Sequence, residues 1–255
     1  MKGIHSALLS GVAKLGVGLA STLVFAGATA AAEGPWQEQV QFAKGASSAV
    51  IKGQLKGDAM VDYVVRAAAG QTLSVKLQET NPQNYFNVLP PGSKGSAMFV
   101  GDTGEDYAGM LPADGDYVVR VYLMRPAARR GESSDYTVTI GVTGNPLAAI
   151  PATKDALVPG THYHAVAKVK CVPAYGTEVS DCDASVIRRG VDGTATVDIG
   201  GGAETRSILF VGGKPVASNA SRIDALSSAR KGDVTIVKLG DTERYEIPDA
   251  LVSGG

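Results

Sequence analysis

The sequence predicts an all-β protein made of two small antiparallel domains of the β-sandwich or barrel type. Apolar and polar residues alternate with a period of two in many short segments, which is typical of half-buried strands. Turn residues separate these segments, among them many of the 32 glycines and 12 prolines. No long stretch has the period of an amphipathic helix. Residues 143–160 contain three prolines and no clear period, so we expect a linker between a domain at 36–142 and a second at 161–252.

Seven strands are expected in the first domain. Phe86 and Val88 alternate with polar neighbours and should face the core, and Pro90-Pro91 should fix a turn. Arg120 alternates with valines, so we expect it to face solvent. The expected strands are 48–55, 61–67, 72–77, 85–89, 97–100, 117–123 and 136–142.

The second domain shows the same alternation of apolar and polar residues in short segments, separated by glycine-rich turns. Residues 221–230 are its one expected short helix or turn. Arg188, Arg189 and Arg206 are interpreted as isolated strand charges, with a second contact surface as the weaker alternative. The expected strands are 163–169, 185–189, 195–199, 207–211, 234–239 and 245–247.

The N-terminus has the regions of a secretory signal peptide in the usual order: a basic region, an apolar run and small residues at the cleavage site. Lys2 and Lys14 precede an apolar run at 15–26, and small residues follow, with cleavage expected after Ala30 or Ala32. The apolar run is too short for a spanning helix, which needs about 20 residues. We therefore predict that residues 1–32 are removed, that the protein is exported, and that it has no membrane span.

Charge and cysteine content narrow the classes of partner. Removing Lys2 and Lys14 leaves 22 of the 24 basic residues against 25 acids, a net charge of −3, which argues against nucleic acid. Cys171 and Cys182 are the only cysteines, and in an exported chain they predict a disulfide. A metal site with His162 and His164 is the weaker alternative because the cysteine spacing does not match zinc sites.

No catalytic constellation can be recognised in the sequence, and no cofactor or metal is predicted. His162 and His164 are interpreted as polar residues at a strand start. Acidic clusters at 102–106 and 181–183 lack the spacing of a calcium loop and are expected to be solvated turns. These observations favour a binding protein over an enzyme.

An arginine-rich segment is the most distinctive feature of the first domain. Between Asp116 and Glu132 the chain has four arginines and neither lysine nor acid. Three of them, Arg125, Arg129 and Arg130, follow an expected strand and should lie in a projecting loop. Arginine suits bidentate contact with carboxylates, so an anionic partner is one explanation. A basic, solvated loop without a partner explains them equally well.

Three blocks together resemble a known family: NPQNYFNVLPPGS (81–93), LPADGDYVVRVYLMRPAARR (111–130) and SDYTVTIGV (134–142). Over residues 36–142 the chain is similar to the periplasmic inhibitors of g-type lysozyme. The resemblance implies a β-sandwich that occludes the substrate cleft of a g-type lysozyme, or of a related glycan-cleaving enzyme, in the periplasm.

Specific roles follow from this resemblance. Arg125 and Arg129 would reach the acidic catalytic region of the lysozyme, and Arg130 would support them. Tyr85 and Tyr122 would be aromatic neighbours, although a place in the core or on a strand face suits them as well. The family usually has polar residues where this chain has Pro126 and Gly131.

A second resemblance leads to a different function. The strand AAAGQTLSVKL (67–77) and the strand DYTVTI (135–140) also resemble pre-peptidase C-terminal domains. That resemblance implies a secreted accessory or peptidoglycan-binding module without inhibitory activity. The second domain resembles a C-terminal module of exported bacterial proteins to which no function is attached, and the oligomeric state is left open.

Overall fold

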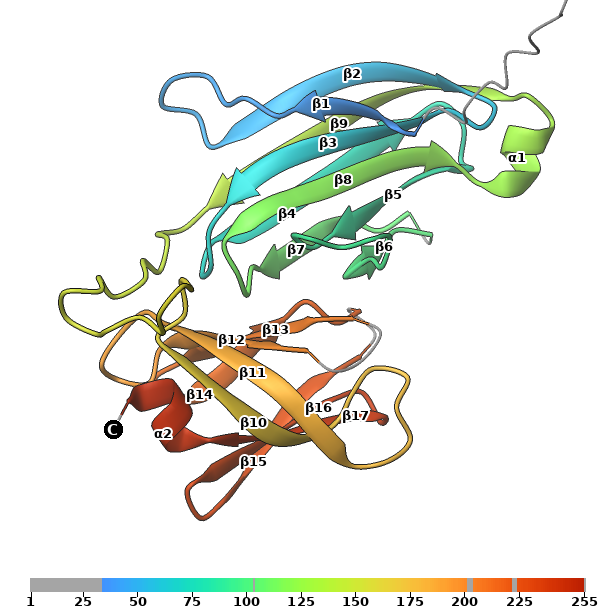
Figure 1. Ribbon diagram of the computed structural model, residues 1–255. Coiled ribbons are helices and arrows are strands. Elements are labelled where there is room, and N and C mark those ends of the chain that lie inside the picture. The colour runs from blue at the N-terminus through green and yellow to red at the C-terminus, as the bar shows by residue number, and fades with distance from the viewer. Residues whose placement is uncertain (1–33, 103, 201–203, 222–223, 255) are drawn as a thin grey trace, which may run out of the picture. The chain divides into compact units, whose positions relative to one another are not determined.

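The computed structural model describes residues 34–102, 104–200, 204–221 and 224–254 (Figure 1). The predicted signal peptide lies outside these residues. Residues 34–255 form one compact unit, and the position of the domain boundary stays a prediction. The elements are β1 (Trp36–Gln39), β2 (Ser48–Lys56), β3 (Met60–Ala67), β4 (Thr72–Glu79), β5 (Asn84–Leu89), β6 (Phe99–Val100), β7 (Tyr107–Met110), β8 (Gly115–Leu123), α1 (Arg125–Arg129), β9 (Ser133–Thr143), β10 (Ala165–Val172), β11 (Ser180–Arg188), β12 (Ala195–Ile199), β13 (Arg206–Val211), β14 (Lys214–Ser218), β15 (Leu226–Lys231), β16 (Val234–Leu239), β17 (Glu243–Pro248) and α2 (Asp249–Ser253).

The N-terminal half is a sandwich of two sheets, which confirms the predicted all-β class. One sheet has the strand order β1-β3-β8-β5-β6 and the other β2-β9-β4-β7. The two inner faces share one core, in which Phe86 and Val88 are buried as predicted. The hydroxyl groups of Tyr63 and Tyr136 lie 2.8 Å apart and join the two sheets. Among the strands that the structure describes in this half, β1 alone departs from antiparallel pairing and runs parallel to β3.

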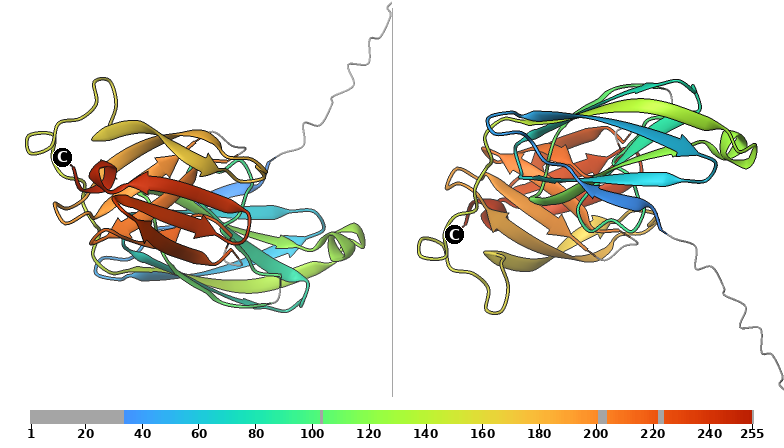
Figure 2. Two further views of the ribbon diagram at one scale, coloured as in Figure 1. Left: turned by 90° about the horizontal axis from the view of Figure 1, so that it is seen from below. Right: turned by 90° about the horizontal axis from the view of Figure 1, so that it is seen from above.

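The C-terminal half is a single eight-stranded sheet with the order β14-β13-β12-β11-β10-β17-β16-β15. The sheet curls until its edge strands β14 and β15 approach each other, so it is nearly closed into a barrel. Apolar side chains fill the interior, and Leu251 and Val252 of α2 add to them. Helix α2 lies at one end of the sheet (Figures 1 and 2). Residues 221–230 were expected to be a short helix or turn, but from Leu226 on this segment belongs to strand β15, which covers Leu226–Lys231.

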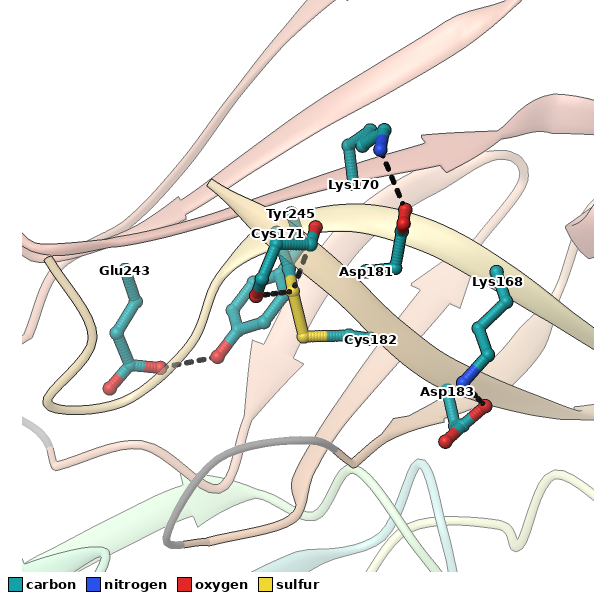
Figure 3. Close-up of a disulfide and its surroundings, with 9 residues drawn as sticks. Lys168, Lys170, Cys171, Asp181, Cys182, Asp183, Glu243 and Tyr245 are labelled. Atoms are coloured by element: carbon teal, nitrogen blue, oxygen red, sulfur yellow. Dashed lines mark hydrogen bonds and ion pairs between the residues drawn. A yellow bond between two sulfur atoms is a disulfide. The ribbon is translucent and has the colours of Figure 1, made fainter. Parts of the chain in front are cut away.

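The disulfide between Cys171 and Cys182 is present, as the cysteine count predicts. It joins β10 to β11 with its Cα atoms 5.9 Å apart, and both cysteines belong to the interior cluster. Two ion pairs between the same strands, Lys168–Asp183 and Lys170–Asp181, flank it (Figure 3). Asp181 and Asp183 are therefore strand residues paired with lysines, whereas the sequence suggested a solvated turn.

The loop closed by the disulfide holds Tyr175 in an unfavourable backbone conformation. Tyr175 has φ +61° and is the only residue other than glycine with positive φ in the described ranges. A hydrogen bond from the amide of Gly176 to the carbonyl of Pro173 (2.8 Å) closes the turn around it. The left-handed conformation costs a side-chain-bearing residue about 1–2 kcal/mol, and the Tyr175 side chain is 82% exposed, so little packing offsets this cost.

We expect Tyr175→Gly to raise the free energy of unfolding by about 0.5–1 kcal/mol. Glycine adopts positive φ without strain, although its greater freedom in the unfolded chain removes part of the gain. Urea denaturation of both proteins measures the change. Val191→Gly is the matched control, because Val191 is also exposed but has no positive φ, and it should lower stability. A loss of stability in Tyr175→Gly would contradict the interpretation.

Candidate partner-binding surface

The segment after β8 forms the one-turn helix α1, whereas the sequence predicted a projecting loop. Pro126 stands in its first turn, where proline needs no amide hydrogen. Gly131 follows the C-cap residue Arg130 with φ +67°, a conformation that glycine adopts readily. The two residues that depart from the family pattern therefore mark the two ends of α1.

So short a helix is not stable alone, and the sandwich holds it in place. Ala127 and Ala128 are buried in the sandwich core. The amide of Met124 donates to the carbonyl of Gln83 (2.8 Å) before the helix, and the amide of Gly57 donates to the carbonyl of Glu132 (2.9 Å) after it. Helix α1 thus has a fixed position at one end of the sandwich, beyond the strands (Figures 1 and 2).

Arg125 and Arg129 are the exposed cationic residues of α1. They are four residues apart and so share one face of the helix, while the two alanines point into the core. Within the described residues neither guanidinium has an ion pair or a side-chain hydrogen bond. Both charges are therefore available to a partner without breaking an internal contact.

Arg130 is placed differently from the two other arginines. Its Nε donates to Oε1 of Glu132 at 2.6 Å, and Nδ2 of Asn81 donates to Oε2 of the same carboxylate at 2.8 Å. These two hydrogen bonds, first from Asn81 and then from Arg130, lower the pKa of Glu132. Arg130 is thus engaged in fastening the end of α1 to the loop before β5.

Tyr85 and Tyr122 lie directly opposite each other on β5 and β8. Met60 of β3 pairs with Tyr122 on the other side, so the three residues form a row on the outer face of the sheet. Both tyrosines are partly buried, and the hydroxyl of Tyr122 donates to Oδ1 of Asn87 at 3.2 Å. Tyr122 is three residues before Arg125, so the tyrosine pair stands at the end of β8 that continues into α1.

Arg120 is on the same outer face of the sheet. The sequence predicted that its side chain would face solvent freely, but the side chain is held in an ion pair. Its Nε and Nη2 bind the two carboxylate oxygens of Asp62 at 2.7 and 2.8 Å. The Asp62 side chain is 3% exposed and that of Arg120 27% exposed. The pKa of Arg120 is raised by this hydrogen bonding. Asp62 on the neighbouring strand therefore neutralises the charge of Arg120, and Arg120 adds little to the cationic surface.

The two histidines do not form a metal site in the described part of the chain, where no group of metal-binding side chains is found. His164 is buried with both ring nitrogens engaged by backbone groups. His162 is exposed, and its ring stacks near that of Tyr163 with centroids 4.1 Å apart. In the second half, Arg189 and Arg206 are buried and paired, which corrects their interpretation as isolated strand charges.

Fold and surface together define a β-sandwich protein with a cationic helical turn exposed at one end, which follows the strand that carries Tyr122 of the Tyr85–Tyr122 pair. Comparison with known proteins agrees with this class. The "Inhibitor of g-type lysozyme" of Escherichia coli (strain K12) is 33% identical over 106 residues, which are 40% of this chain and 78% of the inhibitor. The chain belongs to the family of this inhibitor, which confirms the resemblance seen in its sequence.

Two solved structures are also similar. The periplasmic inhibitor of g-type lysozyme from Aeromonas hydrophila is 38% identical, with 42% of this chain and 96% of that chain covered and a TM-score of 0.41. The one from Salmonella Typhimurium is 28% identical, with 43% and 100% covered and a TM-score of 0.34. No protein-family profile matches the chain. No helix among the described residues is long and apolar enough to cross a membrane.

Proposed function

We propose that the mature chain inhibits g-type lysozyme in the periplasm by inserting α1 into the substrate cleft. Membership of the inhibitor family supports the activity. The observation that carries the mechanism is the exposed pair of Arg125 and Arg129 on a helix anchored to the sandwich core. The pair is rigidly presented and requires little ordering on binding, which favours affinity.

The chemistry of the target fits this surface. Enzymes that cleave glycans use carboxyl groups of Asp and Glu beside the scissile bond. A guanidinium can form charge-assisted hydrogen bonds with such a carboxylate, and these strengthen when water is excluded. In the proposed complex Arg125 and Arg129 contact the acidic catalytic region and so block the site where substrate binds.

The pair of Tyr85 and Tyr122 extends the proposed contact. Tyr85 and Tyr122 are held in register on two adjacent strands, and Tyr122 is further fixed by Asn87. Rigid tyrosines provide a large contact area at a low entropic cost, and they are frequent at the centre of interfaces. We therefore assign them to the partner surface with the two arginines, and Arg130 to positioning α1.

The activity can be tested with lysis assays on bacterial cell walls. The mature chain should inhibit a g-type lysozyme and leave c-type and i-type lysozymes active. A parallel pull-down on insoluble peptidoglycan tests the alternative of an accessory module. Retention on peptidoglycan with no effect on any lysozyme would contradict the proposal and favour that alternative.

The link between Arg130, Glu132 and Asn81 predicts a local response to acid. The pKa of Glu132 is lowered in the folded chain. The link is therefore intact above the ordinary glutamate value of about 4.3 and is lost as the pH falls through the lower folded value. We expect the amide of Gly57, which donates to the carbonyl of Glu132, to lose protection from hydrogen exchange in this range. Glu132→Gln should remove the pH dependence, whereas Glu178→Gln should retain it.

A further inference from the structure

A cavity of about 530 Å³ lies between the segment that connects the two halves and the end of β11. We define the strap as residues 144–164, which connect β9 to β10. The cavity is lined by residues 148–151 of the strap, by Gly190 and Val191 after β11, and by Ser253 and Gly254 at the end of α2. Small-molecule sites have volumes of about 300–1,000 Å³, so this cavity is large enough for a small ligand.

Hydrogen bonds hold the strap in place beside β11. The amide of Ile150 donates to the carbonyl of Arg188 at 2.8 Å. Nε2 of His164 donates to the carbonyl of Ile150 at 2.8 Å, and its Nδ1 accepts from the amide of Arg188 at 3.0 Å. Both oxygens of Asp155 accept from Nη1 of Arg188, at 3.1 and 2.9 Å. The walls of the cavity are therefore formed before any ligand binds, which lowers the entropic cost of binding.

The guanidinium group of Arg188 is only partly engaged by its neighbours. The Arg188 side chain is 12% exposed, and a Cβ atom on Gly254, which also lines the cavity, would lie 3.6 Å from its Cζ. Nη1 binds Asp155, and Nε donates to the carbonyl of Leu251 at 3.4 Å. Within the described residues no acceptor binds Nη2, and this nitrogen is not among the side-chain atoms buried without a partner. Nη2 is therefore accessible to a ligand in the cavity.

Lys154 is the second cation available to a ligand. It lines the same cavity, it is exposed, and it has no ion pair in the part of the chain that the structure describes. Arg189 also lines the cavity, but its side chain is 0% exposed and all three of its nitrogens are hydrogen-bonded within the protein. Asp155 is the acid among the described lining residues, and Arg188 engages it. The cavity therefore offers two positively charged donor groups.

We propose that this cavity binds the C-terminal carboxylate of a short peptide that ends in a small apolar residue. Nη2 of Arg188 and Nζ of Lys154 each donate a charge-assisted hydrogen bond to a carboxylate oxygen. Ala149 and Val191 line the cavity and offer apolar contacts to a side chain of the size of alanine. A monoanion fits better than a dianion such as phosphate, because Asp155 lies beside the two cations. The proposal concerns the strap and the second half and does not rest on inhibition by α1.

Nuclear magnetic resonance titration of the full mature chain tests this site. The probe is N-acetyl-alanyl-alanine, and the same dipeptide with a C-terminal amide is the control ligand. The acid should cause saturable shifts of the Ala149 and Val191 amides, which line the cavity, and leave the buried amides of β12 unchanged. The amide should bind at least about tenfold more weakly, because it lacks the charge that both donors recognise.

Two lysine variants test the role of charge in the cavity. Lys154→Ala removes a cation from an exposed residue without an ion pair in the described ranges, so it should fold normally and bind the acid about tenfold more weakly. Lys214→Ala removes the same charge from an exposed residue of β14 that does not line the cavity. This second variant should bind the acid as the wild type does.

Saturable binding of the acid that is weakened in Lys154→Ala would support the site. Three results would overturn it: no saturable shift of the Ala149 and Val191 amides at about 10 mM probe, equal affinity for the acid and the amide, or unchanged affinity in Lys154→Ala. Tighter binding of inorganic phosphate than of the dipeptide would also overturn it, because it would indicate a site for a dianion.

Discussion

Inhibition of g-type lysozyme should fall at least about a hundredfold in the double variant Arg125→Ala, Arg129→Ala. Arginines buried against carboxylates at an interface are frequent hot spots, each with a cost of about 2 kcal/mol or more on truncation. Because 1.4 kcal/mol corresponds to a factor of ten, two such losses amount to a factor of a hundred or more. The measurement is the inhibition constant in a lysis assay, with folding checked by circular dichroism.

The matched control for this variant is Arg66→Ala, Arg230→Ala. It also removes two positive charges, but from exposed side chains outside α1: Arg66 is on β3 and Arg230 is on β15. Inhibition should be nearly unchanged, since exposed ion pairs contribute little. Arg130→Ala should have an intermediate effect, because Arg130 acts through Glu132. Full inhibition by the Arg125, Arg129 variant would show that α1 is not the inserted element.

The largest effect on stability is expected from Arg206→Met in the eight-stranded sheet. Nε and Nη2 of Arg206 bind both oxygens of Glu243 at 2.8 and 2.7 Å, and Nη1 binds Glu204 at 2.7 Å. The hydroxyl of Tyr245 donates to Glu243 at 2.8 Å. In the sheet order three strands separate β13 from β17, so the ion pair between Arg206 and Glu243 crosses the interior of the sheet. Glu243 is the first residue of β17, and α2 follows the last residue of that strand.

Removing Arg206 leaves two carboxylates without their partner in a buried site, where the Arg206 side chain is 9% exposed. Breaking a buried pair in this way costs about 3–5 kcal/mol, or roughly 10 °C in Tm for a chain of this size. The variant Arg206→Met, Glu204→Gln, Glu243→Gln removes the charges together and should recover much of the loss. Thermal melts measure both; a shift below about 1 °C in the single variant would contradict the burial argument.

Much of the fold could be predicted because the alternation of apolar and polar residues indicates which face of a strand is buried. The expected bounds of β12 and β16 agree with the structure, as do the buried positions of Phe86 and Val88. Strands β1 and β15 were missed because nearly all their residues are exposed. Such edge strands are defined by backbone pairing, and backbone pairing leaves no periodic signal in the side chains.

The position of α1 could have been predicted from local signals, whereas the buried charges could not. A proline in the first turn and a glycine after the last residue are boundary signals even for one helical turn, and both are present at Pro126 and Gly131. Arg189 binds Asp114 from 75 residues away, and Arg206 binds Glu243 from 37 residues away. Only the folded topology brings such partners together, so sequence alone suggested isolated charges.

Calorimetric titration of a g-type lysozyme with the mature chain, with and without a soluble glycan fragment in the cleft, tests the central claim most directly. Insertion of α1 predicts binding that weakens with salt, because it depends on charge, and that is reduced competitively by the fragment. The Arg125, Arg129 double variant should bind far more weakly in the same titration. Undiminished binding when the cleft is filled, or no binding at all, would contradict the account.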